Sequence, residues 1–189
     1  MFADTAAPGA GTNHQARPDT NVTLRKPDGE DGAKLHALVK RCKPLDENSL
    51  YCNLLQCTHF ADTCVAAELD GKLVGFISAY IPPKQQSTLF VWQVAVDEKA
   101  RGLGLASRML AELLDRDECQ NVQYIDTTIT PDNDASWALF RRFADKRRYR
   151  TETFILFDSR IHFSGAHKDE HLLRIGPFNL TPVNDTLNH

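Results

Sequence analysis

The stretch Val94-Ala95-Val96, followed by Arg101-Gly102-Leu103-Gly104-Leu105-Ala106, decides the fold of this chain. An apolar strand runs into a basic turn with spaced glycines, and the turn opens an amphipathic helix. Glycine lets the backbone approach a ligand closely, and the free N–H groups and positive dipole end of a helix N-terminus attract an anion. The pattern therefore predicts a binding site for a pyrophosphate group. Which ligand contains that group has to be inferred from the rest of the chain.

Composition narrows the class of protein. The chain has 189 residues, enough for one domain with a sizeable core. A net charge of −3 argues against a nucleic-acid partner. Five cysteines without regular spacing indicate free thiols in a reducing compartment, and no Cys/His set with zinc spacing predicts a metal. No apolar run reaches the roughly 20 residues of a membrane span, and no secretion signal is present, so we expect a cytoplasmic protein without a membrane partner.

The hydrophobic pattern divides the chain into three parts. Residues 1–21 are expected to be a disordered N-terminal segment, residues 22–178 a folded domain and residues 179–189 a flexible tail. In the domain we expect the order β-α-α-β-β-β-α-β-α-β, a mixed sheet with helices on both faces. Asp46 is expected to cap the second helix, and Asp70-Gly71 to close a tight hairpin. The remaining expected elements are strands 60–69, 72–81, 88–96, 122–130 and 149–158 and a helix at 135–143.

Three motifs together resemble the GCN5-related N-acetyltransferase superfamily. The hairpin at residues 69–76 is similar to its second and third strands, and residues 133–140 are similar to the helix after its fifth strand. Residues 101–106 match its acetyl-CoA motif, [RQ]-x-x-G-x-[GA], at every fixed position. The resemblance implies an α/β fold of the α+β type, with a mixed, splayed central sheet of six to seven strands. It also implies acetyl-CoA as cosubstrate.

Residues 46–55, 90–97 and 167–172 resemble the diaminobutyrate acetyltransferase branch of that superfamily. This resemblance implies that acetyl passes from acetyl-CoA to the 4-amino group of L-2,4-diaminobutyrate. The product, N4-acetyl-L-2,4-diaminobutyrate, would serve the synthesis of ectoine, a compatible solute used in osmoprotection. The resemblance further implies a homodimer.

The resemblance also assigns residues to the cofactor. The amides of residues 101–106 would face the pyrophosphate, and the strand at residues 94–96 would pair with the pantetheine arm. A backbone N–H near Ala95 would be the oxyanion donor, and Asn133 would contact the pantetheine arm or its phosphate. Many relatives carry a tyrosine that protonates the leaving thiolate, but Phe140 stands here, so that proton must come from elsewhere or from solvent. The full set is Val94, Ala95, Val96, Arg101, Gly102, Leu103, Gly104, Leu105, Ala106, Asn133 and Phe140.

A substrate with two ammonium groups needs acidic and aromatic side chains around it. The branch resemblance supplies Asp46, Tyr51, Trp92, His167 and Glu170. Glu170 would bind the ammonium or relay its proton, and His167 would share a face with it if that segment is helical. Four of these assignments have a structural alternative, which is a helix cap for Asp46, core packing for Tyr51 and Trp92, and a surface charge for Glu170.

Several alternatives stay open at this point. The basic run from Arg141 to Arg150 is either a solvated face at a helix C-terminus or an attractor of the 3′-phosphate of the cofactor. Cys119 lies among acidic residues, which disfavours a thiolate nucleophile and favours direct transfer in a ternary complex. The rival functions are acetylation of another small amine or a protein N-terminus, and a non-catalytic acetyl-CoA sensor.

Overall fold

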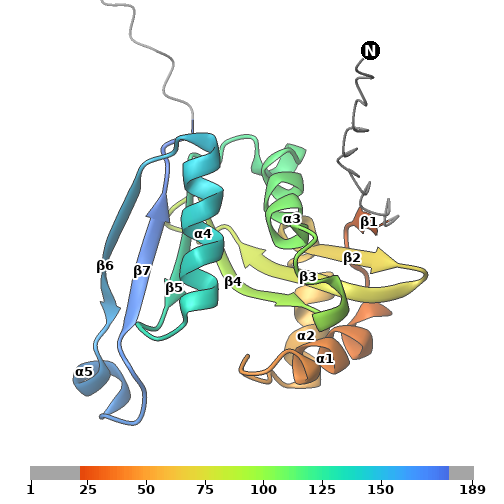
Figure 1. The fold of residues 1–189 in the computed structure, drawn as a ribbon, viewed down its shortest axis with the longest axis horizontal. Coiled ribbons are helices and arrows are strands. Elements are labelled where there is room, and N and C mark those ends of the chain that lie inside the picture. Colours follow the sequence, from red (N-terminus) through yellow and green to blue (C-terminus); the bar gives the residue numbers. More distant parts are fainter. Residues whose placement is uncertain (1–21, 179–189) are drawn as a thin grey trace, which may run out of the picture.

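The computed structural model describes residues 22–178, so the predicted disordered segment at residues 1–21 and the predicted tail at residues 179–189 lie outside the described residues. Seven strands form one sheet in the order β1-β2-β3-β4-β5-β7-β6 (Figure 1). The strands are β1 (Val22–Arg25), β2 (Val65–Leu69), β3 (Lys72–Tyr80), β4 (Thr88–Val96), β5 (Tyr124–Ile129), β6 (Thr151–Phe157) and β7 (Glu170–Ile175). The helices are α1 (Asp31–Arg41), α2 (Leu50–Thr58), α3 (Leu105–Leu114), α4 (Asp134–Arg147) and α5 (Ser159–Phe163).

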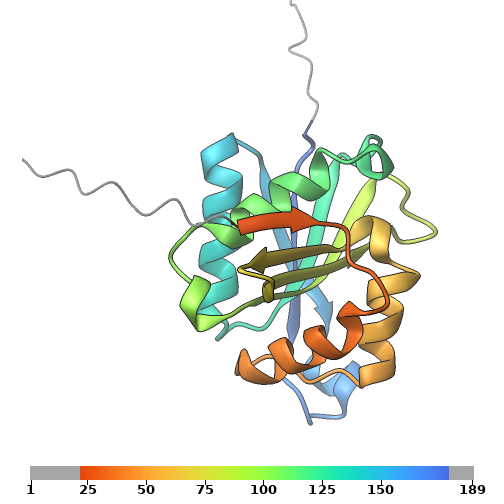
Figure 2. The ribbon, with the colours of Figure 1, turned by 90° about the vertical axis from the view of Figure 1, so that its right-hand side faces the viewer.

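Helices cover both faces of the sheet, as the sequence predicts. Figure 2 shows α3 and α4 on one side of the strands and α1 and α2 on the other. The larger apolar cluster lies beneath α3 and α4, with Met109, Leu110 and Phe143 among its fully buried members. A smaller cluster lies beneath α1, built on Leu35 and Leu38. Among the described helices, none is long and apolar enough to cross a membrane.

The predicted hairpin between β2 and β3 is confirmed. Asp70 and Gly71 have φ values of 50° and 70°. Two successive residues with positive φ are the mark of a two-residue turn whose twist matches that of the flanking strands.

Strands β4 and β5 separate partway along their length. They pair in parallel only from Thr88 to Val91, opposite residues 124–127. From Gln93 to Val96, β4 keeps its partner β3 but has no ladder to β5. One edge of β4 is therefore free for a ligand where the two strands diverge.

A β-bulge lies where this separation begins. Ser78 of β3 pairs with Gln93, and Ala79 pairs with Val91, so Trp92 is the extra residue of β4. A bulge shifts the alternation of side chains between the two faces of a sheet. After it, Val94 and Val96 pack on the α3 side, and Ala95 packs in the cluster beneath α1.

Two local expectations need correction. Asp46 does not cap the second helix, because α2 begins at Leu50 and Ser49 caps it by accepting a hydrogen bond from the Cys52 N–H at 3.1 Å. The strand expected at residues 60–69 begins only at Val65, because residues 61–63 form a 3-10 turn. In both cases a capping or turn hydrogen bond takes precedence over the apolar pattern.

The end of the domain also differs from expectation. The strand expected at residues 149–158 forms as β6, but it lies at the edge, because β7 inserts between β5 and β6. The segment carrying His167 and Glu170 is a loop that enters β7, and not a helix. The two side chains still lie together, with His167 Nδ1 at 4.0 Å from Glu170 Oε1.

Candidate active site

The glycine turn opens α3 as predicted. Gly102 and Gly104 have φ values of 78° and 69°, in the left-handed region that glycine adopts without strain. The six consecutive backbone N–H groups of residues 102–107 donate no hydrogen bond within the described part of the chain. Unpaired donors at a helix N-terminus form a ready anion site. This donor set matches the needs of a diphosphate.

The free edge of β4 continues from this turn. Asp97 N–H donates to the Val74 carbonyl of β3 at 2.8 Å, and the donors of a strand alternate between its two sides. Ala95 N–H therefore faces β3, whereas the N–H groups of Val94 and Val96 face the side where β4 and β5 diverge. Arg101 Nε donates to the Val96 carbonyl from that open side, at 3.3 Å.

Asp97, which the sequence analysis did not single out, holds the turn in place. Its carboxylate caps the 3-10 turn at residues 98–100 by accepting from Lys99 N–H at 3.1 Å, and it binds the Arg41 guanidinium of α1. The Lys99 hydrogen bond and the Arg41 charge lower the pKa of Asp97. The signal available in the sequence was an aspartate directly after an apolar strand, where a cap is common.

An acidic group lies on the other side of the site. Glu170 opens β7, and burial raises the pKa of its carboxyl above the ordinary glutamate value. Thr128 and His167 oppose this rise, and the carboxylate of Asp46 adds to it. The structure thus places His167 beside Glu170. Asp46, more than 120 positions earlier in the chain, is near enough for its charge to raise the pKa of Glu170.

The two predicted aromatic residues are exposed. Trp92 keeps 47% of its surface accessible at the bulge, and Tyr51 keeps 70% in the first turn of α2. The core alternative is therefore wrong for both. A large apolar surface left exposed beside a free strand edge is typical of a binding site.

Two residues assigned to the cofactor have structural roles of their own. Asn133 caps α4 by accepting a hydrogen bond from Ser136 N–H at 3.1 Å, which leaves its amide NH2 group for a ligand. Phe140 is 2% exposed and belongs to the core beneath α4. It has no hydroxyl, so it cannot supply the proton that a tyrosine would give to a leaving thiolate.

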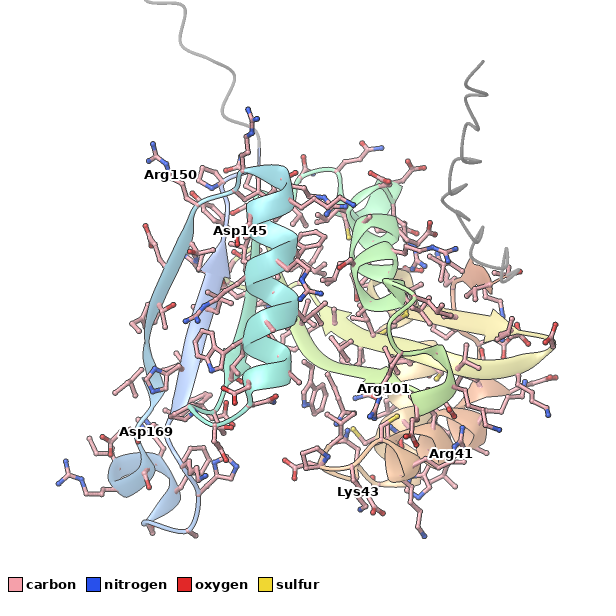
Figure 3. All side chains as sticks on the ribbon, in the orientation of Figure 1. Arg41, Lys43, Arg101, Asp145, Arg150 and Asp169 are labelled. Atoms are coloured by element: carbon pink, nitrogen blue, oxygen red, sulfur yellow. The ribbon has the colours of Figure 1, made fainter. Side chains whose placement is uncertain are left out.

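The basic run lies away from the glycine turn. In Figure 3, Arg150 and Asp145 lie at the C-terminal end of α4, whereas Arg101 lies apart from them, below α3 in the view. Arg141 stacks over Trp137 with its guanidinium carbon 4.7 Å from the ring centre, and Arg147 stacks over Phe143 at 4.0 Å. This arrangement favours the solvated helix face over a site for the 3′-phosphate.

Neither a cysteine nucleophile nor a metal site is supported by the described residues. Burial raises the pKa of the Cys119 thiol to about 11, so it is not a ready nucleophile. Within residues 22–178, no group of three or more His, Cys, Asp or Glu side chains has the arrangement of a metal site.

The fold and the site define an acyl-CoA-dependent transferase. The pattern of the Acetyltransferase (GNAT) family matches residues 33–144, and the chain belongs to this family. Ard1 from Thermoplasma volcanium shares the fold, with a TM-score of 0.64 at 15% sequence identity over 82% of this chain and 97% of that one.

More similar relatives act on one particular substrate. The L-2,4-diaminobutyric acid acetyltransferase of Methylotuvimicrobium alcaliphilum is 52% identical over 83% of this chain and 91% of its own length. That of Halomonas elongata is 46% identical over 96% and 94%. The diaminobutyrate acetyltransferase EctA from Paenibacillus lautus, solved with L-2,4-diaminobutyric acid and coenzyme A, has a TM-score of 0.80 and 40% identity, over 85% of this chain and 97% of that one.

Proposed function

We propose that this protein transfers acetyl from acetyl-CoA to the 4-amino group of L-2,4-diaminobutyrate, giving N4-acetyl-L-2,4-diaminobutyrate for ectoine synthesis. The observation that carries the proposal is a GNAT fold with unpaired N–H groups in its glycine turn and a β4 edge that is unpaired with β5 beyond Val91. The buried carboxyl of Glu170, whose pKa the charge of Asp46 helps to raise, supports an amine as the acceptor. The high identity to diaminobutyrate acetyltransferases over most of the chain supports the choice of substrate.

The residues divide the reaction into three tasks. The N–H groups of residues 102–107 bind the diphosphate of acetyl-CoA, and the open edge of β4 binds its pantetheine arm. Val94 N–H, which faces that edge, donates to the thioester oxygen, where a well-placed donor lowers the barrier by roughly 3–4 kcal/mol. We therefore propose Val94 N–H as this donor, one residue before the donor expected near Ala95.

Asp46 and Glu170 bind the ammonium groups of the substrate, with Trp92 offering an aromatic face to a cation. The raised pKa of Glu170 makes its carboxylate a better acceptor for the ammonium proton, directly or through water. The neutral amine attacks the thioester carbon, a C–N bond forms, and the C–S bond breaks. The attacking nitrogen releases its second proton to water as the amide forms. Because Phe140 has no proton to give, the departing thiolate takes its proton from solvent.

The experiment that tests this function locates the new acetyl group. Purified protein is mixed with acetyl-CoA and diaminobutyrate, and the product is analysed by tandem mass spectrometry. Acetyl on N4, with turnover far above that of ornithine, lysine and spermidine, supports the proposal. Higher turnover of another amine or an N-terminal peptide would favour the rival substrate, and acetyl-CoA binding without any product would favour a sensor.

We also propose a homodimer that forms through β6. This edge strand exposes side chains on both faces, including Phe154, Ile155 and Phe157, and Ile161 of α5 beside it is 80% exposed. An exposed apolar edge strand pairs readily with another chain. Light scattering should give a molar mass of twice that of the chain for the wild type, and of a single chain for Ile155→Lys.

We place the enzyme in the cytoplasm, where a reducing environment keeps thiols free. All five cysteines are unpaired, and four of them are buried. Activity that is unchanged with and without reductant in the purification would agree with this placement.

A further inference from the structure

Gln93 joins β4 to the loop between α1 and α2, and neither the family motif nor the proposed chemistry gives it a role. Its Nε2 donates to the backbone carbonyl of Asp46 at 3.0 Å. Its Oε1 accepts from Nδ2 of Asn48 at 3.3 Å. The two bonds require the same orientation of the amide, so one side chain holds the loop at two points.

The bulge at Trp92 makes this contact possible. Side chains alternate between the faces of a strand, so without a bulge positions 91, 93 and 95 would share one face. Val91 packs in the core on the α3 side, whereas Ala95 packs beneath α1. The extra residue Trp92 therefore turns Gln93 toward the side of the sheet that carries the α1–α2 loop.

Little else fixes this loop to the sheet. Lys43 and Glu47 form an ion pair, but both belong to the loop and are exposed, so their pairing does not anchor it. Leu45 adds an apolar contact to the cluster beneath α1. Among the hydrogen bonds of residues 22–178, those of Gln93 are the ones that join residues 43–48 to a strand.

We infer that Gln93 is a positioning residue that holds the Asp46 carboxylate where the ammonium group of the substrate binds. The inference rests on the proposed function, because it concerns the same amine. Gln93 binds the backbone carbonyl of Asp46 and so restrains the position of the Asp46 side chain. The next residue in β4 is Val94, whose N–H is proposed to face the thioester. Strand β4 thus fixes the position of the Asp46 carboxylate, which binds the amine, relative to Val94 N–H, which polarises the thioester carbonyl. Holding two reacting groups in the correct relative position is a large contribution to catalysis.

A double-mutant cycle tests this role. Gln93→Met keeps the length of the side chain and removes both hydrogen bonds. We expect the KM for diaminobutyrate to rise about tenfold, the effect of one or two lost hydrogen bonds, while the Kd for acetyl-CoA stays within about twofold. In an Asp46→Ala background, Gln93→Met should add less than about twofold, because residues that act through one another are not additive.

Gln86→Met is the matched control. Gln86 Nε2 also donates to a backbone carbonyl, that of Pro83 at 2.8 Å, in the exposed turn between β3 and β4. This variant should leave the KM for diaminobutyrate and the Kd for acetyl-CoA unchanged. Additive effects of Gln93→Met and Asp46→Ala, or an equal loss of acetyl-CoA affinity, would overturn the inference. Failure of the proposed function would instead show in the wild-type protein, as absence of diaminobutyrate turnover.

Discussion

The glycine turn at residues 101–106 and the acidic group of Asp46 and Glu170 are built in opposite ways. The turn is continuous in sequence and is proposed to act through its backbone, with donors left free by the start of a helix. The acidic group is proposed to act through side chains that belong to a loop and to a distant strand. The difference teaches that changes in the turn should act on the cofactor, and changes in the acidic group on the amine.

The largest expected effect separates these two regions at Gly104. For Gly104→Glu we expect the Kd for acetyl-CoA to rise about 100-fold or more, because a left-handed backbone strains a non-glycine residue by roughly 1–2 kcal/mol and a carboxylate repels the diphosphate. Isothermal titration calorimetry of the variant and the wild type measures this Kd. Gly71→Glu is the control, since Gly71 has a φ of 70° and open space around it in the β2–β3 turn. Normal cofactor affinity in Gly104→Glu would show that the diphosphate binds elsewhere.

The next effect belongs to the acidic group. Glu170→Gln should lower kcat for diaminobutyrate by about 100-fold, as expected for loss of a proton acceptor, and leave acetyl-CoA affinity unchanged. Only the ionised carboxylate accepts a proton, so wild-type kcat should rise with pH through the raised pKa of Glu170. Glu170→Gln should lack this rise, and pH–rate profiles of both proteins measure it.

The same substitution has an opposite effect on stability. Burial raises the pKa of Glu170 in the folded state, so its ionised form costs folding free energy above the pKa of the unfolded chain. The neutral glutamine removes that cost at pH 7, and the Tm of Glu170→Gln should lie above that of the wild type. A lower Tm together with a lower kcat would point to a structural role for Glu170.

A smaller effect is expected at Trp92. Trp92→Ala should lower kcat/KM for diaminobutyrate about tenfold, in line with the loss of a cation–π contact of roughly 1–2 kcal/mol. Because the Trp92 side chain is half exposed, the Tm of the Trp92→Ala variant should differ little from that of the wild type. Phe60→Ala, which removes a 38% exposed aromatic ring that packs on Tyr80, is the control and should leave kinetics unchanged.

The smallest effect concerns the basic end of α4. The double variant Lys146→Glu, Arg150→Glu should keep the Kd for acetyl-CoA within about twofold at physiological salt, because exposed charges far from the ligand are screened there. Arg101→Glu, in the glycine turn, should weaken binding much more. An equal loss in both variants would restore the 3′-phosphate role for the basic run.

Local signals in the sequence were sufficient for the glycine turn and the hairpin. Gly102, Gly104 and Asp70-Gly71 adopt the positive φ values that their residue types favour, and these conformations depend on neighbouring residues only. Asp46 and the segment at residues 167–172 show where such signals stop. Ser49 replaced Asp46 as the cap, and pairing with Phe157 of β6 made Glu170 part of a strand.

The sequence by itself determined the order of the helices and strands as far as β6, the family and the glycine turn, because these follow from short-range propensity and from contiguous motifs. It did not predict α5 and β7. Only the tertiary structure decided that the charge of Asp46 lies near enough to raise the pKa of Glu170, that Trp92 forms a bulge, and that Gln93 meets the α1–α2 loop. These features arise from strand register and from interactions between residues far apart in the chain, such as the 47 positions that separate Asp46 from Gln93. A register shift of one residue moves a side chain to the other face of a sheet, and no local pattern reports it.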